Sequence, residues 1–184
     1  MSITINGNGT VTGISVGGLP DGIVDTDMIA ANAVTPAKST IQGGKILQFK
    51  QSADSSEHSS ASASGNGADV AGMSQDITLT SSSNKVLVMI SCNPYIGGSG
   101  GGRYALKLFR DTTMIFEETY ANYRETDGTT KATRSSFIYL DNPADTNAHT
   151  YKVALKKESG SNTVYLFNEG ANAHTITLME VDVS

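Results

Sequence analysis

Apolar and polar residues form a series of short, strand-like segments along most of the chain. The clearest is residues 86–90, five consecutive apolar residues that follow Ser81, Ser82, Ser83 and Asn84 and precede Asn93 and Pro94. A run of this length is too short for a helix, which needs roughly ten or more residues, and it fits a strand buried on both faces. We therefore expect a second sheet to cover it.

The other apolar segments are also short and separated by turn-forming residues. The pattern predicts strands near residues 44–51, 77–80, 105–109, 114–116, 137–140, 151–155, 164–167 and 176–183. It also predicts a mobile low-complexity loop at 52–68 and a flexible hairpin tip at 97–102. The strand at 151–155 alternates with polar residues, so one of its faces should meet solvent. About eight or nine such strands predict an all-β, jelly-roll-like antiparallel sandwich with little helix.

Residues 1–42 differ from the rest and are predicted to form an extended N-terminal arm, with residues 43–184 as the head domain. Glycines interrupt short β-like pieces at 3–5 and 11–16. So few apolar residues cannot offset the entropy of ordering the segment alone, so they should be buried against partners or other copies. The expected attachment residues are Ile3, Ile5, Val11, Ile14, Val16, Leu19, Val24, Met28, Ile29 and Val34.

Charge and cysteine content exclude several classes of protein. The net charge of −5 provides no basic surface for a phosphate backbone, so we expect no nucleic-acid partner. The N-terminus lacks a signal peptide's basic and apolar regions, and no segment reaches the roughly 18 apolar residues of a membrane span. We therefore expect assembly in the cytoplasm and no membrane insertion. Cys92 is the single cysteine, forms no intrachain disulfide and should be a small buried hydrophobe.

The sequence matches one catalytic motif, but without the neighbouring elements and partner residues that the motif needs. Residues 97–101 match G-x-S-x-G around Ser99, but neither a helix nor acid and histidine partners accompany them. Glu117 and Glu118 are adjacent on a predicted strand and should point to opposite faces, which prevents paired acid and base catalysis. We expect no catalytic residue and no enzymatic activity.

Metal and cofactor sites are not predicted either. His58, His149 and His174 are scattered and have no zinc-ligand spacing, although a trimer axis could bring one histidine from each chain together. Residues 141–147 contain several possible oxygen ligands. Pro143 at the third position of the segment, and the lack of a Gly bend or a distal Glu, favour a turn over a calcium loop.

The seven tyrosines supply the best candidates for recognition. Tyr95, Tyr120 and Tyr123 lie near predicted loops, where tyrosine provides a large contact area and a polar group at low entropic cost. They are the candidate surface for recognition. Tyr139 and Tyr151, which lie within predicted strands, should pack between sheets.

The arm carries a family resemblance. The sequence TGISVGGLPDG at 12–22, then Val24-Asp25 and AVTPAK at 33–38, resembles the linker of tail-fibre and other virion proteins of marine and cyanobacterial tailed phages. The segment SSNKVLV at 82–88 is similar to the heads of those proteins. The resemblance implies a compact all-β head that assembles as a trimer, and a location in the virion. Here the linker starts at the chain's own N-terminus, which leaves the attachment point open.

Two functions fit these observations. The first is a short trimeric tail fibre or receptor-binding protein, anchored by the arm to other virion proteins of the tail, whose distal loops meet a host surface glycan or protein. The alternative is a trimeric capsid decoration protein whose arm clamps capsid subunits, which the short length favours. An extended arm suits both, because strand addition uses main-chain hydrogen bonds. A homotrimer is predicted in either case, since arm and head both need burial between chains.

Overall fold

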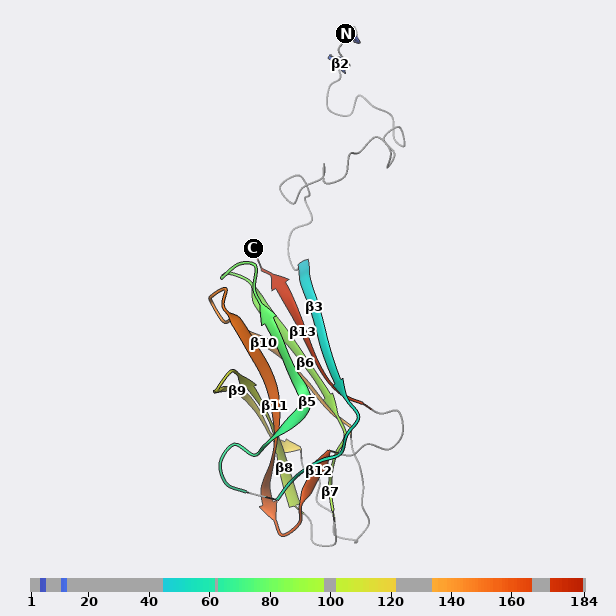
Figure 1. Cartoon of the computed structure of the whole chain (residues 1–184), viewed down its shortest axis with the longest axis vertical. Helices are drawn as coiled ribbons and strands as arrows, with labels where there is room; N and C mark the ends of the chain where they lie inside the picture. Colours follow the sequence, from blue (N-terminus) through green and yellow to red (C-terminus); the bar gives the residue numbers. More distant parts are fainter. Residues whose placement is uncertain are drawn as a thin grey trace. The chain divides into compact units, whose positions relative to one another are not determined.

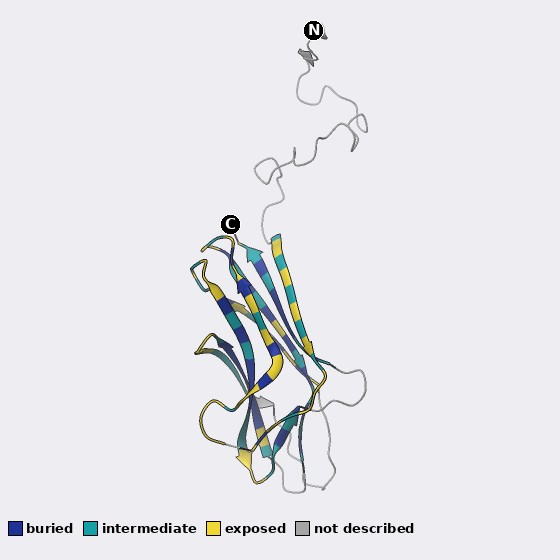
Figure 2. Ribbon diagram, in the orientation of Figure 1, coloured by how far each residue is buried: buried dark blue, intermediate teal, exposed yellow. Residues whose placement is uncertain are grey.

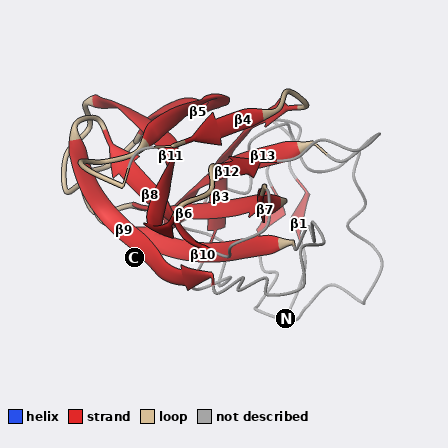
Figure 3. Cartoon of the chain, turned by 90° about the horizontal axis from the view of Figure 1, so that it is seen from below, coloured by secondary structure: helices blue, strands red, loops and turns tan. Residues whose placement is uncertain are grey.

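The structure is a computed structural model that describes residues 4–5, 11–12, 45–61, 63–97, 102–121, 134–166 and 173–183. Every regular element among these residues is a β-strand (Figure 3), which confirms the predicted all-β class. By its contacts the chain divides into two compact units, Met1–Gln42 and Gly43–Ser184. No helix in the described part of the chain is long and apolar enough to cross a membrane.

In the first unit, two short strands are described. Strand β1 (Thr4–Ile5) pairs antiparallel with β2 (Val11–Thr12), and Ile5 lies opposite Val11. Both strands fall within the β-like pieces predicted from the sequence. The short helical turns that the sequence suggests near Asp27 and Thr35 lie outside the described residues.

The second unit, the head, contains two four-stranded antiparallel sheets and a small third sheet (Figure 1). Sheet 1 has the order β10 (Ser135–Asp141), β6 (Lys85–Cys92), β13 (His174–Asp182) and β3 (Lys45–Asp54). Sheet 2 has the order β5 (Ala68–Thr78), β11 (Ala148–Gly160), β8 (Gly102–Arg110) and β9 (Thr113–Ala121). The small sheet has the order β4 (His58–Ser60), β12 (Val164–Leu166) and β7 (Pro94–Ile96).

The eight long strands pair from the outside of the sequence inward. Strand β3 pairs with β13, β5 with β11, β6 with β10, and β8 with its neighbour β9. This is a long antiparallel ribbon, with its turn between β8 and β9, rolled into two sheets. Such pairing is the jelly-roll connectivity, so the predicted sandwich is confirmed at the level of topology.

The core lies between sheets 1 and 2, and buried residues alternate with less buried ones along the strands (Figure 2). In β6, Val86, Val88 and Ile90 are at most 2% exposed. Leu87 is only half-buried, however, and Met89 is 36% exposed. The prediction that residues 86–90 are buried on both faces is therefore wrong for the single chain, because sheet 2 covers only the inner face.

The strand whose two faces are both buried is β8. All side chains from Tyr104 to Phe109 are buried, and Lys107 reaches out to the carbonyl of Gly65 at 3.5 Å. The ammonium group of Lys152 lies 5.7 Å from the centre of the Phe109 ring. The loop before β5 and the long lysine side chains thus cover the outer face of sheet 2 at this strand.

Part of the low-complexity segment 52–68, predicted to be a loop, is sheet instead. Strand β3 continues to Asp54, and β4 occupies His58–Ser60. Tertiary contacts decide this, since the Ser52 hydroxyl donates to the carbonyl of Ser74 at 2.9 Å and Ser60 is buried. Gly72 allows the close approach: it has a φ of +80°, and a Cβ there would lie 2.6 Å from the Cβ of Asp54.

Replacing Val88 by Asp is expected to abolish folding. Val88 is 0% exposed and lies between Tyr139 and Leu178 on the neighbouring strands. An unpaired carboxylate there costs several kcal/mol, comparable with the roughly 5–15 kcal/mol that stabilises a domain. Circular dichroism and thermal melting of Val88→Asp measure this. Met89→Asp, one position along and facing outward, is the control and should keep the wild-type fold; equal loss in both variants would contradict the one-sided core.

Candidate functional site

The outer face of sheet 1 is the candidate functional site, because most of the head's exposed apolar side chains gather there. The strand registers align outward residues in rows that cross the sheet from β10 through β6 and β13 to β3. The first row is entirely apolar, the second is half apolar, and the third is made of small polar residues and alanine. In order they are Leu140, Leu87, Met179 and Phe49; Ile138, Met89, Thr177 and Gln51; and Ser136, Ser91, Thr175 and Ala53.

Exposure identifies the same surface. Eight large hydrophobic residues of the described chain are exposed, and seven of them lie on the strands of sheet 1 or directly after β13. The largest fractions are 63% for Ile138 and 60% for Phe49. A register shift opposite Glu180 leaves the adjacent Ile46 and Leu47 both exposed at the start of β3. The eighth residue, Met114, belongs to β9 of sheet 2.

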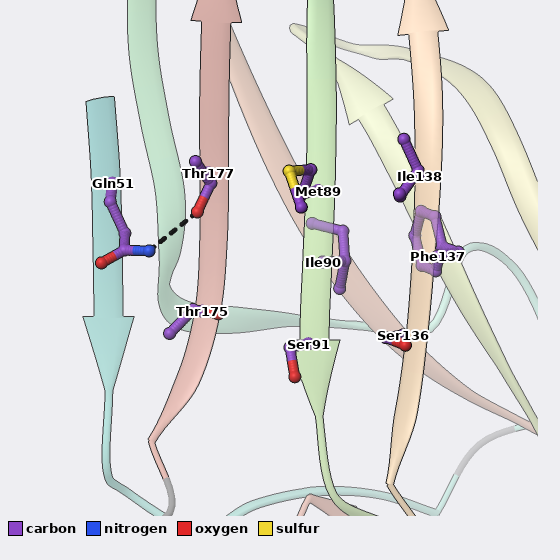
Figure 4. Close-up of a pocket in the computed structure, with 9 residues that line it drawn as sticks. All are labelled: Gln51, Met89, Ile90, Ser91, Ser136, Phe137, Ile138, Thr175 and Thr177. Carbon is purple, nitrogen blue, oxygen red and sulfur yellow. Dashed lines mark hydrogen bonds between the residues drawn. The ribbon is translucent and has the colours of Figure 1, made fainter. Parts of the chain in front are cut away.

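The same face is hollowed at its polar end (Figure 4). The hollow encloses about 280 Å³, and outward side chains that line it include Met89, Ile138, Ser91, Ser136 and Thr175. It forms where the short serine and threonine side chains of the third row adjoin the longer side chains of the second. Gln51 and Thr177, which also line it, are joined by a hydrogen bond of 2.8 Å from the amide nitrogen to the hydroxyl.

Charge is confined to the ends of this face. The twelve residues of the three rows include no charged side chain. Lys85 stands opposite Val181 beyond the apolar row. At the other end, Arg134 donates from Nε to the Ser91 hydroxyl at 3.0 Å. An uncharged centre with polar groups at its rim is the composition of a protein interface.

A buried carboxylate fixes the apolar end of the sheet. Glu180 is 0% exposed and accepts hydrogen bonds from the backbone and hydroxyl of Thr80 and from the amide groups of Asn84 and Gln48, at 2.5–2.7 Å. Burial opposes its ionisation, but these donors outweigh burial and hold the pKa of Glu180 below its usual value. The turn between β5 and β6 is thereby attached to β13. This role was not predictable from the sequence pattern, because a lone Glu in a strand is usually expected to face solvent.

A second polar cluster ties the two sheets together. Asp141, at the end of β10 in sheet 1, accepts a hydrogen bond from Arg110 of β8 at 2.7 Å and from the Tyr151 hydroxyl of β11 at 2.6 Å. Tyr151 is fully buried, as predicted, and its pKa is raised by burial and by the carboxylate. The cluster is structural, since its charges satisfy one another.

The loop 141–147, weighed above as a turn or a calcium site, is held by its own side chains. Asp145 accepts from the backbone amide of Asn147 at 2.7 Å and contacts His149 Nε2 at 3.0 Å. His149 Nδ1 lies 2.7 Å from Asp111, whose other oxygen accepts from the amide of Thr150. These carboxylates therefore brace the turn, in line with the interpretation favoured from sequence.

Two of the three histidines, predicted to be scattered, lie near one carboxylate. Asp54 hydrogen-bonds His58 and is the cross-strand partner of His174. His174 is 0% exposed, and burial lowers its pKa, which favours the neutral ring. The rolled ribbon brings these residues together, which spacing along the chain could not show. Even so, no group of three or more His, Cys, Asp and Glu side chains in the described parts of the chain is arranged to hold a metal ion.

Of the tyrosines proposed for recognition, Tyr95 can be placed in full. It is half-buried in β7 and stacks on Tyr165 of β12, with ring centres 4.8 Å apart and planes 14° from parallel. Its hydroxyl donates to Glu57 at 3.3 Å, and burial together with that carboxylate raises its pKa to about 12. Tyr123 and the side chain of Tyr120 lie outside the described residues, so the structure does not join the three into one surface. Tyr139 packs against Phe116, as predicted.

The remaining residues singled out in the sequence fall into two groups. Cys92 is fully buried, as predicted, and burial raises its pKa to about 12. Glu117 approaches Lys107 while Glu118 accepts from Ser135 of the facing sheet, so the two carboxylates do diverge. Ser99 lies outside the described residues. Of the predicted attachment residues, only Ile5 and Val11 lie within them; those outside are Ile3, Ile14, Val16, Leu19, Val24, Met28, Ile29 and Val34.

Comparison with known proteins gives no family assignment. No protein-family model matches the sequence, and no curated protein matches it. Among solved structures, the Gx strain of infectious bursal disease virus is 14% identical, with a TM-score of 0.33, over 74% of this chain and 37% of that one. The structure of the Gt strain is 11% identical, with a TM-score of 0.34, over 73% of this chain and 40% of that one. Dimeric latent PorU from Porphyromonas gingivalis is 12% identical, with a TM-score of 0.31, over 78% of this chain and 14% of that one.

The chain spans less than half the length of each of these structures. Likenesses of this strength extend to a virus and to a bacterial protein alike. They therefore carry no inference about function.

The brace at His149 predicts a pH-dependent contribution to stability. Burial disfavours the charged ring, but Asp111 and Asp145 outweigh burial and raise the pKa of His149 above 6.5. Stability from this shift is full below pH 6.5 and is lost as the pH rises through the folded-state pKa. The pKa of Asp111 is lowered from 3.8, because the His149 and Thr150 hydrogen bonds outweigh burial, so its contribution is lost on acidification. The brace should act most strongly between about pH 4 and 6.5.

His149→Gln should therefore lower the melting temperature by roughly 2–4 °C at pH 5.5, the size expected for loss of about one hydrogen bond in a domain of this length. The deficit should shrink towards pH 9, as the wild-type ring loses its proton. Melting curves of both proteins at the two pH values measure it. A deficit that is equal at both, or larger at pH 9, would show that the charge of His149 contributes nothing.

Proposed function

We propose that the chain is a non-enzymatic virion structural protein of a tailed phage, a short trimeric tail fibre or receptor-binding protein anchored by residues 1–42. The observation that carries the proposal is the order of parts: a Gly-Leu-Pro-Asp-Gly linker of the kind found in phage virion proteins precedes a jelly-roll head. The apolar outer face of sheet 1 adds support, since an assembly of chains would bury it.

The polar groups of the head also favour a structural role. Glu180, Asp141 and His149 hold turns and sheets together through hydrogen bonds within the chain. A catalytic acid or base instead needs a poised group within reach of a substrate. The stacked Tyr95 and Tyr165 remain as a candidate contact for a host glycan or protein.

Localisation on the particle tests the proposal. Antibody labelling of purified virions by electron microscopy should place the protein on the tail. Label distributed over the capsid would instead support the alternative, a decoration protein whose arm clamps capsid subunits. Absence from washed particles would overturn both.

Deleting residues 1–42 should leave a folded head that no longer joins particles. The core, the polar ties and all eight long strands belong to the head, so its melting temperature should change by no more than a few degrees. Incorporation of the full and truncated proteins into particles lacking the native copy measures attachment. A truncated head that still incorporates, or that melts far below the full chain, would show that residues 1–42 are not an attachment arm.

The purified full chain should be a trimer. An apolar sheet face and an arm whose sequence has few apolar residues both favour burial between chains, and closed rings are the usual solution. Multi-angle light scattering at micromolar concentration should give three times the mass of one chain. A monomer at that concentration would refute the homotrimer.

A further inference from the structure

We infer that the outer face of sheet 1 is the surface through which copies of this chain associate. The inference rests on the proposed function, in which the protein is an assembly of identical chains, and identifies the surface that such an assembly would use. The sequence of strand β6 has five consecutive apolar residues, as in a strand buried on both faces. The single chain buries only Val86, Val88 and Ile90, and leaves Leu87 and Met89 turned outward.

The size of the face suits a stable interface. Four strands at about 4.8 Å spacing span roughly 19 Å, and eight residues at about 3.4 Å span roughly 27 Å, which gives roughly 500 Å² in projection. The accessible area of side chains standing on this plane is larger than their projection. It therefore approaches the roughly 800 Å² that each partner contributes to a standard interface.

Charge favours a second copy of this chain over a different partner. The chain carries a net charge of −5, so two copies repel each other over most of their surface. The three rows on sheet 1 contain no charged residue, and the nearest cations stand at the ends as Lys85 and Arg134. Identical chains can meet here without opposing like charges. A different partner selected by charge complementarity would find nothing to select.

The edges of the sheet direct association to its face. Lys45 and Lys50 lie on the edge strand β3, and Arg134 directly precedes the other edge strand, β10. Lysines on an edge strand disfavour strand-to-strand pairing between copies. Burial of the exposed apolar residues must then come from contacts made by the face of the sheet and not by its edges.

The relief of the face provides a knob and a hole. Phe49 is 60% exposed, and two residues further along β3, Gln51 lines the hollow of about 280 Å³. An aromatic side chain from a neighbouring copy would fill the hollow between Met89 and Ile138 and cover the serine hydroxyls. Aromatic residues that enter a well-packed pocket are among those that carry much of the energy of an interface.

The test is the association of purified full-length Phe49→Lys and Ile138→Lys, with Met114→Lys as the matched control. Met114 is also exposed and apolar, at 43%, but lies on β9 outside this face. All three substitutions are at exposed positions and should leave the head folded. Sedimentation velocity over a dilution series should show at least a tenfold weaker association for the first two variants. The Met114→Lys control should associate as strongly as the wild type.

Three results would overturn the inference. They are a wild-type chain that is monomeric, an oligomer unchanged by Phe49→Lys and Ile138→Lys, and an oligomer weakened equally by Met114→Lys. An interface elsewhere leaves the virion proposal intact, because incorporation into particles decides that separately. Absence of the protein from particles would overturn the virion proposal and leave the association measured in solution unaffected.

Cross-linking provides a second measurement if a lysine variant fails to fold. Positions 49 and 138 lie on the two edge strands, at least roughly 14 Å apart within one chain by strand spacing, so a shorter thiol cross-linker joins them only between copies. The buried Cys92, whose pKa is raised to about 12, stays unreactive. Phe49→Cys combined with Ile138→Cys should yield covalent oligomers. Monomers alone, from a protein that is oligomeric in solution, would place the interface elsewhere or leave the face to the chain's own arm.

Discussion

A sheet has two faces, and in this head one of them is left to the solvent. Sheet 2 buries the inner face of sheet 1, where Val88 and Leu178 are fully enclosed. The outer face carries a row of four apolar residues from Leu140 to Phe49 with no layer over it within the described head. Burial of apolar area is the main favourable term in folding and association alike. The same strands therefore supply the core of the head on one face and carry an exposed apolar surface on the other.

Where apolar contacts end, polar ties hold the sandwich. Glu180 attaches the turn before β6 to β13, and Asp141 joins sheet 1 to sheet 2 through Arg110 and Tyr151. Each buried charge has several donors, which is the condition under which burying a carboxylate is tolerable. These ties fix the register of β6 and β13, so the rows on the outer face depend on them. A one-residue slip of either strand would turn its apolar residues inward and its core residues outward.

Sequence patterns predicted the strand class, most strand positions and the burial of Cys92, because period and turn residues are local signals. They placed the two-sided burial on β6 instead of β8, since a continuous apolar run does not reveal which layer covers it. They treated residues 52–68 as a loop because serine and alanine have weak strand preference, which the contact of Ser52 with β5 overrides. The apolar face was invisible for another reason: its rows combine residues from four strands whose register only the rolled ribbon determines. The contacts of Glu180 and the approach of His174 to Asp54 depend on the same long-range pairing.

Pairing of the head's first strand, β3, with its last, β13, has a further consequence for assembly. It places the start of β3, where the head begins after residues 1–42, beside the end of β13, and Val181 lies opposite Ile46 in the apolar part of sheet 1. Copies joined through this face would have the first residues of their heads close to the shared interface. Several arms would then start from one region, and binding of one would raise the effective concentration of the others at their sites. Weak contacts from an arm with few apolar residues could in this way give firm attachment, so association of the heads and attachment by the arms would reinforce each other.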